Sequence, residues 1–399
     1  MARGESCNQT AQQPAVPPPP PSDWALFRFP GELDAVSQEL MHKYFVRNPI
    51  RDPICPFELF NLFIDFGQDP FQCFRALTGD MLCFRATLLL TSACEDLVIQ
   101  RPLSGGTLTH LRLLLPILHS RLSDAASNQT DLILFAVGIM VSIAVLFGDQ
   151  TAMAAHAVGL RQIIHLRGGF RALDHNPMVQ FSLDRALVTQ QWTSLYDSSI
   201  WKEPIFINQL TDMNCPHEKV SVTGLVDSRL EPVFRTLQET TLLFNKHFYR
   251  NERIEGRFAQ QCLGFVHSQL LELDGCFIDG FSETLRLGMM AFLATTFRIP
   301  GLGVQRAYRG TFEKLQLSLS SDKPGTPHLH EKISIWIMIV RVMFTESRDG
   351  LQVPALWRKT VVHKRSWEEI RCCLKEVMWV DSLHDNPGKG AYNILATEG

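Results

Sequence analysis

The stretch that most constrains the fold of this chain is an apolar run from Leu132 to Phe147, broken only by one glycine and one serine. The run is about 16 residues long and is followed by Gly148 and Asp149, whereas a membrane-spanning helix needs roughly 20 apolar residues. A helix that is apolar on all sides and too short for a membrane is typical of a protein core. The run therefore predicts a buried central helix over 131–147, with a membrane segment as the less favoured alternative.

A second helix is predicted directly after the first, over 152–167. Thr151 is placed to be its N-cap, and Gly168 and Gly169 are placed to end it because glycine accepts left-handed backbone. Small side chains in its first half are expected to let the axes of the two helices approach closely. These small residues are Ala152, Ala154, Ala155, Ala157 and Gly159. The pattern predicts an apolar helical hairpin that turns at 148–149.

Helical periodicity continues through most of the rest of the chain. Further helices are predicted over 32–47, 57–66, 71–77, 81–99, 107–122, 177–197, 228–249, 257–273, 282–297, 304–319 and 331–346. Pro116 is expected to kink or break its helix. Ser366 and Glu369 form a capping box that predicts the start of the last helix. Strand signals are nearly absent, so the predicted fold class is all-α, a single multi-helix array around the apolar hairpin.

The domain organisation is predicted from shifts in composition. Residues 1–28 are polar and rich in proline, with five consecutive prolines at 17–21, and are predicted to be a disordered tail. A proline-rich docking site is the alternative for this tail. Residues 29–399 are predicted to form one helical domain, with a candidate seam at the irregular segment 201–226.

The charge balance and the cysteines of the chain indicate which partners and which compartment it fits. The chain has 38 basic and 41 acidic residues, a net charge of −3, so no broad cationic field favours binding of nucleic acid. Its start lacks the apolar core of a secretory signal, and most of its ten cysteines lie in apolar helical patterns, where free thiols pack as small hydrophobes. These features favour a reducing, intracellular compartment.

Motifs that carry chemistry are not found in the sequence. It contains neither a Gly-x-Ser-x-Gly nucleophile elbow nor a Gly-x-x-x-x-Gly-Lys-Ser/Thr phosphate loop. The segment 320–323 matches Ser-x-x-Lys by spacing only, and we interpret that match as chance. The basic segment 363–365 is interpreted as solvated surface, with a phosphate or partner contact as the minority alternative.

The histidines offer no metal site by spacing. His156 and His165 are nine residues apart, which places them on nearly opposite sides of one helix. We interpret His156 as a packed or capping residue, and His328 and His330 as part of a solvated loop. The sequence accordingly predicts no catalytic, cofactor-binding or metal-binding residue and no cofactor.

Two groups of segments carry a resemblance to a known family. The first group comprises the segment 121–124 (RLSD), the apolar helix, 148–149, His156, 159–160 and 164–169 (IHLRGG); the second comprises 366–369 (SWEE), 379–381 (WVD) and 384–389 (HDNPGK). Together these segments resemble the regulatory, fungal-specific transcription factor domain that follows the zinc-cluster DNA-binding module in fungal regulators. The resemblance extends from about Phe29 to the C-terminus, and its motifs are diffuse and apolar. It implies that the helices form an antiparallel array around the central hairpin.

The resemblance implies a non-enzymatic transcriptional regulator or co-regulator in the nucleus. It implies action through protein partners, as a homodimer or as a heterodimer with intact relatives, and through a small-molecule effector. The target implied by relatives is a metabolic or secondary-metabolite gene set. Two alternatives are a helical interaction or ligand-binding scaffold that has left transcription, with the cytoplasm as its location, and an enzyme with an all-helical pocket.

This chain departs from the family at the DNA-binding module. That module needs six cysteines with two Cys-x2-Cys pairs, which hold two zinc ions. No two cysteines here are three residues apart, and the thiols of adjacent Cys372 and Cys373 would point about 100° apart on a helix. Direct DNA binding through this chain is therefore not expected, and the 5′ end of the transcript would show whether a zinc cluster is encoded upstream.

Overall fold

The computed structural model of the chain describes residues 28–47, 64–67, 72–99, 101–124, 130–176, 179–180, 183, 219–296, 309–320, 331–344 and 365–398. Within these ranges the chain forms 13 α-helices and two short strands, which confirms the all-α prediction. None of the helices in the described part has the length and apolar character needed to cross a membrane. The predicted tail lies outside the described residues except for Arg28.

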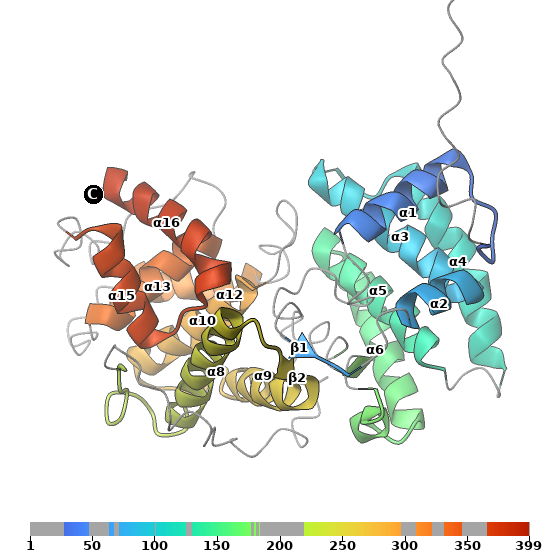
Figure 1. Ribbon diagram of the computed structural model, residues 1–399. Coiled ribbons are helices and arrows are strands. Elements are labelled where there is room, and N and C mark those ends of the chain that lie inside the picture. The colour runs from blue at the N-terminus through green and yellow to red at the C-terminus, as the bar shows by residue number, and fades with distance from the viewer. Residues whose placement is uncertain are drawn as a thin grey trace, which may run out of the picture.

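The helices form two groups, each around its own hydrophobic core (Figure 1). The first group, here the N-terminal lobe, comprises α1 (Ala35–Arg47), α2 (Gln72–Gly79), α3 (Met81–Val98), α4 (Gly105–Ser123), α5 (Asp131–Phe147), α6 (Gln150–Leu166) and the 3-10 helix η3 (Phe170–Leu173). The second, the C-terminal lobe, comprises α8 (Glu231–Arg250), α9 (Gly256–Glu272), α10 (Gly280–Ala294), α12 (Arg309–Ser320), α13 (Glu331–Phe344), α15 (Trp367–Val377) and α16 (Asp381–Glu398).

The apolar run forms α5 with the predicted bounds, and α5 is the central helix of the N-terminal lobe. It packs against α3, α4 and α6, and nearly all of its side chains are buried. Gly148 ends the helix in the left-handed conformation, with φ of 74°. The predicted N-cap Thr151 of the next helix is wrong, because α6 begins at Gln150 and the Asp149 carboxylate accepts the N–H of Ala152.

The small residues of α6 do not form its packed face. The buried side chains of α6 are Met153, Ala157, Leu160 and Ile164. Of the small residues expected at the helix contact, only Ala157 is buried, while Ala155 and the neighbouring Val158 are exposed, Val158 by 53%. The spacing of i, i+4, i+7 and i+11 brings the larger apolar side chains onto α5, where they bury more surface.

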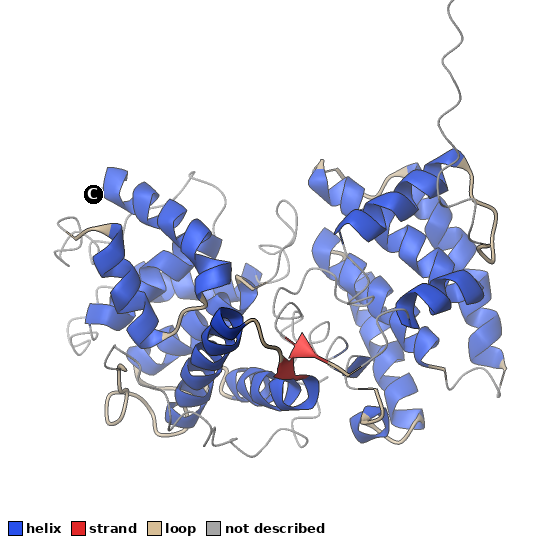
Figure 2. Cartoon of the chain, viewed as in Figure 1, coloured by secondary structure: helices blue, strands red, loops and turns tan. Residues whose placement is uncertain are grey.

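Two strands of two residues each lie between the lobes (Figures 1 and 2). β1 (Ile64–Asp65) pairs in parallel with β2 (Ile254–Glu255). The helix predicted over 57–66 is therefore wrong at Ile64 and Asp65, and its residues 57–63 lie outside the described ranges. Pairing with a segment about 190 residues away overrides the local periodicity at this point.

The C-terminal lobe confirms the capping box but adds a helix that the sequence did not predict. Ser366 accepts the N–H of Glu369, and the Glu369 carboxylate accepts the N–H of Ser366. The resulting α15 is followed by α16, which continues through Pro387 and Gly388. A Cβ on Gly388 would lie 2.6 Å from two ring carbons of Trp379, so the glycine allows α16 to pack directly on this indole.

Other predictions differ from the structure at particular places. Pro116 lies inside the continuous α4, so the predicted alternative of a break is wrong. The helix predicted over 177–197 lies almost wholly outside the described residues. Of the candidate seam 201–226, the described part 219–226 has no helix or strand, and Val220 and Val222 are buried in the C-terminal core. The division into domains remains a prediction.

Candidate functional site

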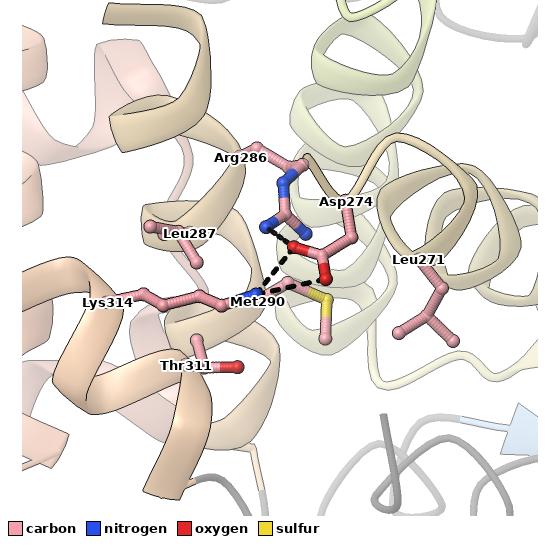
Figure 3. A pocket seen from close by; sticks show the side chains of 7 residues that line it. All are labelled: Leu271, Asp274, Arg286, Leu287, Met290, Thr311 and Lys314. Carbon is pink, nitrogen blue, oxygen red and sulfur yellow. Dashed lines mark hydrogen bonds and ion pairs between the residues drawn. The ribbon is translucent and has the colours of Figure 1, made fainter. Parts of the chain in front are cut away.

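A small cavity lies in the C-terminal lobe, between the end of α9 and helices α10 and α12 (Figure 3). It is lined by Leu271, Asp274, Arg286, Leu287, Met290, Thr311 and Lys314. Its volume of about 20 Å³ is room for a single water molecule. Three charged groups therefore meet around a space that is too small for a metabolite.

The charges around this cavity neutralise one another. The Arg286 side chain is buried, and its Nη2 lies 2.5 Å from Oδ1 of Asp274 and 2.7 Å from Oε1 of Glu283, while its Nη1 donates to the carbonyl of Leu270. Lys314 Nζ adds two contacts to Asp274, at 2.9 and 3.0 Å. Figure 3 shows both cations directed at the one carboxylate. This arrangement joins three helices and leaves no cation available for a substrate anion.

A buried histidine lies beneath the start of α16. The backbone N–H of Val380 donates to Nδ1 of His384, so the proton of the neutral ring is on Nε2, which lies 3.1 Å from the hydroxyl of Thr295. The ring packs against Phe292 and Trp379, at centroid distances of 4.7 and 5.1 Å. Burial lowers the pKa of His384 to about 3. His384 is therefore a neutral structural residue at physiological pH.

Two carboxylates next to this histidine hold α8, α15 and α16 together. Arg371 donates to both oxygens of Asp385, at 2.8 and 2.7 Å. Oδ2 of buried Asp381 lies 2.5 Å from the Tyr249 hydroxyl, 2.7 Å from Lys375 and 3.1 Å from Arg371. The bond to Asp381 raises the pKa of Tyr249. Oδ1 of Asp381 is buried without a hydrogen-bond partner.

Asn245 completes this network from the middle of α8. Its amide nitrogen donates to the carbonyl of Trp379 at 2.7 Å, and its amide oxygen accepts the N–H of Asp381 at 2.8 Å. The network thus fixes the turn between α15 and α16 through backbone groups as well as through charges. Its carboxylates are already bound by cations, which makes it a structural cluster rather than an acid–base pair.

The RLSD and IHLRGG segments supply ion pairs in the N-terminal lobe. Arg121 pairs with Asp80 at 2.7 Å, and Arg167 pairs with Asp131 at 2.6 Å, at the start of α5. Asn176 donates to the other oxygen of Asp131. Burial alone would raise the pKa of Asp131, but the bonds from Arg167 and Asn176 outweigh it and hold that pKa below its usual value. The Arg167 pair ties the two ends of the helical hairpin together, and the Arg121 pair ties the end of α4 to the start of α3.

The residues weighed for chemistry in the sequence do not come together. His156 is half-buried and burial lowers its pKa, whereas His165 is exposed on the same helix. His328, His330 and most of the segments 320–323 and 363–365 lie outside the described residues. Arg365, at the end of the basic segment, forms an ion pair with Glu331 at 2.7 Å.

Three cysteines in apolar helical patterns agree with the packing prediction, whereas Cys276 is exposed. Cys83, Cys94 and Cys262 are buried, and burial raises the pKa of Cys262 to about 12. Cys372 and Cys373 are half-buried free thiols on α15. Among the described side chains, no group of three or more His, Cys, Asp or Glu is arranged to hold a metal ion.

The polar network at the start of α16 was not predicted from the sequence. The available signal was a carboxylate, Asp381, directly after the apolar triplet 378–380. The chain matches no protein-family model, no curated protein and no solved structure.

Proposed function

We propose that this protein is a transcriptional regulator or co-regulator of fungal type. It acts in the nucleus through protein partners, either a second copy or relatives that retain the zinc cluster, and responds to a small-molecule effector. Its own chain contributes no zinc-cluster module and does not contact DNA through one.

One observation carries the proposal: the segments that resemble the fungal regulatory domain are those that organise both helical cores. Arg121 and Arg167, from the RLSD and IHLRGG segments, fasten α4 and α6 to their neighbours. Trp379 and His384, from the C-terminal segments, are buried where α16 meets the C-terminal lobe. The resemblance thus falls on residues that determine the architecture.

The polar groups of the described part favour regulation over catalysis. The cavity near Arg286 has room for about one water molecule, and its charges are paired. The buried network around Asp381 holds three helices together. Catalytic sites need convergent polar groups next to a space for substrate, and neither cluster offers that space. We therefore propose a non-enzymatic function.

Tethering to DNA tests this function directly. The full chain is fused to an unrelated DNA-binding domain and expressed with a reporter gene that carries the matching site. We expect the fusion to change reporter output relative to the DNA-binding domain alone, and we expect a tagged copy of the chain to enter the nucleus.

The controls separate regulation from misfolding. Trp336→Ala removes a large buried side chain and is expected to abolish the reporter effect, whereas Gly390→Ala, in open space on α16, is expected to leave it unchanged. An unchanged reporter together with exclusion from the nucleus would contradict the proposal. That result would favour an interaction or ligand-binding scaffold that no longer takes part in transcription.

A further inference from the structure

β1 belongs to the N-terminal half of the sequence but packs in the core of the other lobe. It lies between α1 and α2 along the chain. Ile64 is only 2% exposed and is part of the hydrophobic core of the C-terminal lobe. Half-buried Phe66 packs against the same core. A segment of the N-terminal half therefore reaches across and inserts an apolar side chain into the C-terminal lobe.

The backbone of β1 is held as closely as its side chains. Ile64 pairs with Ile254, and Asp65 pairs with Glu255, in a parallel ladder. The residue after the ladder is Gly256, where a Cβ would lie 2.5 Å from Cδ1 of Phe66 and 3.0 Å from the carbonyl oxygen of Asp65. Any side chain at this position would displace β1, so the approach depends on glycine.

The same end of α9 carries a second contact to the N-terminal lobe. The Glu255 carboxylate caps the helix by accepting the N–H groups of Arg257 and Phe258. The guanidinium of Arg257 donates to the carbonyl of Asp174, just after η3, at 3.0 Å. Residues 254–258 thus contact two segments of the N-terminal half of the sequence, β1 and Asp174, that are far apart along the chain.

We propose that β1 is a strap that fastens the two lobes to each other and can be released without unfolding either of them. Among the described elements that contact each other extensively, the pairs of β1 with β2 and with α9 are the ones that join the N-terminal half of the sequence to the C-terminal lobe. The strap has a two-residue ladder and one fully buried side chain, whereas each lobe has a core of its own. The inference does not depend on the proposed transcriptional function.

Ile64→Asp tests the strap in the full-length chain. The charge removes the favourable burial of Ile64, and amide hydrogen exchange at residues 254–258 should become about tenfold to hundredfold faster. Exchange in the core helices α5 and α13 should stay unchanged. Small-angle X-ray scattering should show a larger radius of gyration, because the lobes separate.

A second variant perturbs the contact from the opposite side. Gly256→Val leaves Ile64 intact but places a side chain where Phe66 lies, and we expect the same exchange pattern and the same expansion. Ile64→Val is the matched control, since a shorter apolar side chain keeps the burial. Gly280→Ala, in open space at the start of α10, controls for replacing a glycine in this lobe.

Three outcomes would overturn the proposal. Unchanged exchange at residues 254–258 in both variants would show that β1 does not protect this segment. Faster exchange in α13 of both variants would show that β1 cannot be released without unfolding the C-terminal lobe. An unchanged radius of gyration, despite faster exchange at 254–258, would show that other contacts fasten the lobes.

Discussion

The two lobes pair their buried polar groups over very different distances along the chain. In the N-terminal lobe, buried Asp96 accepts from Thr107, 11 residues away, and from the backbone of Ser104, eight residues away. In the C-terminal lobe, Asn245 donates to the carbonyl of Trp379, 134 residues away. Gln238 donates to carbonyls up to 139 residues away, in the last turn of α15. The described polar contacts of the first lobe thus span at most 52 residues, as between Lys43 and Glu95, whereas those of the second reach 139 residues.

Because of this difference in sequence distance, the two lobes become stable in different ways. A helix such as α5 is buried by its sequence neighbours α3, α4 and α6, so the N-terminal core can close over short loops. A contact between residues far apart in sequence stabilises the fold only after a large loop has closed, and closing that loop costs conformational entropy. The C-terminal lobe therefore depends more on a few buried polar residues whose partners are distant.

The largest expected effect comes from removing one buried ring in one lobe. Trp336 is fully buried, and its indole N–H donates to the carbonyl of Met378 at 2.8 Å. Trp336→Ala should lower the free energy of unfolding of the C-terminal lobe by about 3–5 kcal/mol. Hydrogen exchange should become faster in α8 to α16 and stay unchanged in α3 to α6.

Phe135→Ala is the matched change in α5, where the ring is almost fully buried. We expect faster hydrogen exchange in the N-terminal lobe of this variant and unchanged exchange in the C-terminal lobe. If either variant loses protection in both lobes to the same extent, the lobes unfold together and the comparison between them fails.

A smaller effect is expected from two glycines of α16. A Cβ on Gly388 would contact the Trp379 ring at 2.6 Å, so Gly388→Ala should destabilise the protein by about 1–3 kcal/mol. Gly390 has no atom within 4 Å of that position, and Gly390→Ala should stabilise by about 0.5–1 kcal/mol through helix propensity. Thermal denaturation of both variants measures the difference, and shifts of the same sign would contradict the packing described here.

An effect of similar size is the dependence of stability on pH that His384 contributes. Burial lowers the pKa of His384 to about 3, whereas the unfolded chain titrates near its ordinary value of 6.5. Below pH 6.5 the unfolded state takes up a proton that the folded state does not, so stability falls as the pH falls towards 3. Between pH 7.5 and 5.5 this contribution should be about 1.4 kcal/mol.

Urea denaturation at the two pH values gives the change in the free energy of unfolding. Comparing that change between the native protein and His384→Gln isolates the contribution of His384. Burial also lowers the pKa of His110 and His156 in the N-terminal lobe, so both proteins should keep a residual dependence of the same sign. An identical dependence in the two proteins would show that His384 is not held neutral in the folded state.

The N-terminal lobe was largely predictable from the sequence, because its signals are local. The apolar run predicted the bounds of α5, and the glycine pair predicted the end of α6. Its N-cap was assigned two residues late because both Asp149 and Thr151 have capping side chains. The exposed small residues of α6 were wrongly expected at the helix contact, since composition does not show which face is turned inward.

The features missed in the C-terminal lobe and at β1 depend on distant partners. Pro387 and Gly388 indicate a helix end in isolation, but the contact with Trp379 overrides their low helix propensity. Ile64 forms a strand only because Ile254 lies beside it. The network of Asp381 has no local signature, since Asn245 is 136 residues away. The capping box at Ser366 and the helices α8, α9, α10 and α13 could be predicted from neighbouring residues.

The position of α16 sets the order in which the lobes can fold during synthesis. The ribosome synthesises α8 and α13 before the segment that carries Trp379. Until that segment emerges, the side-chain amide of Asn245 is hydrated and lacks its protein partner. The N-terminal lobe has all the elements of its core by then. Translation therefore leaves a period in which one half of the nascent chain is native and the other still exposes its apolar helices. During that period the exposed apolar helices make the nascent chain prone to aggregation, until α16 packs against them.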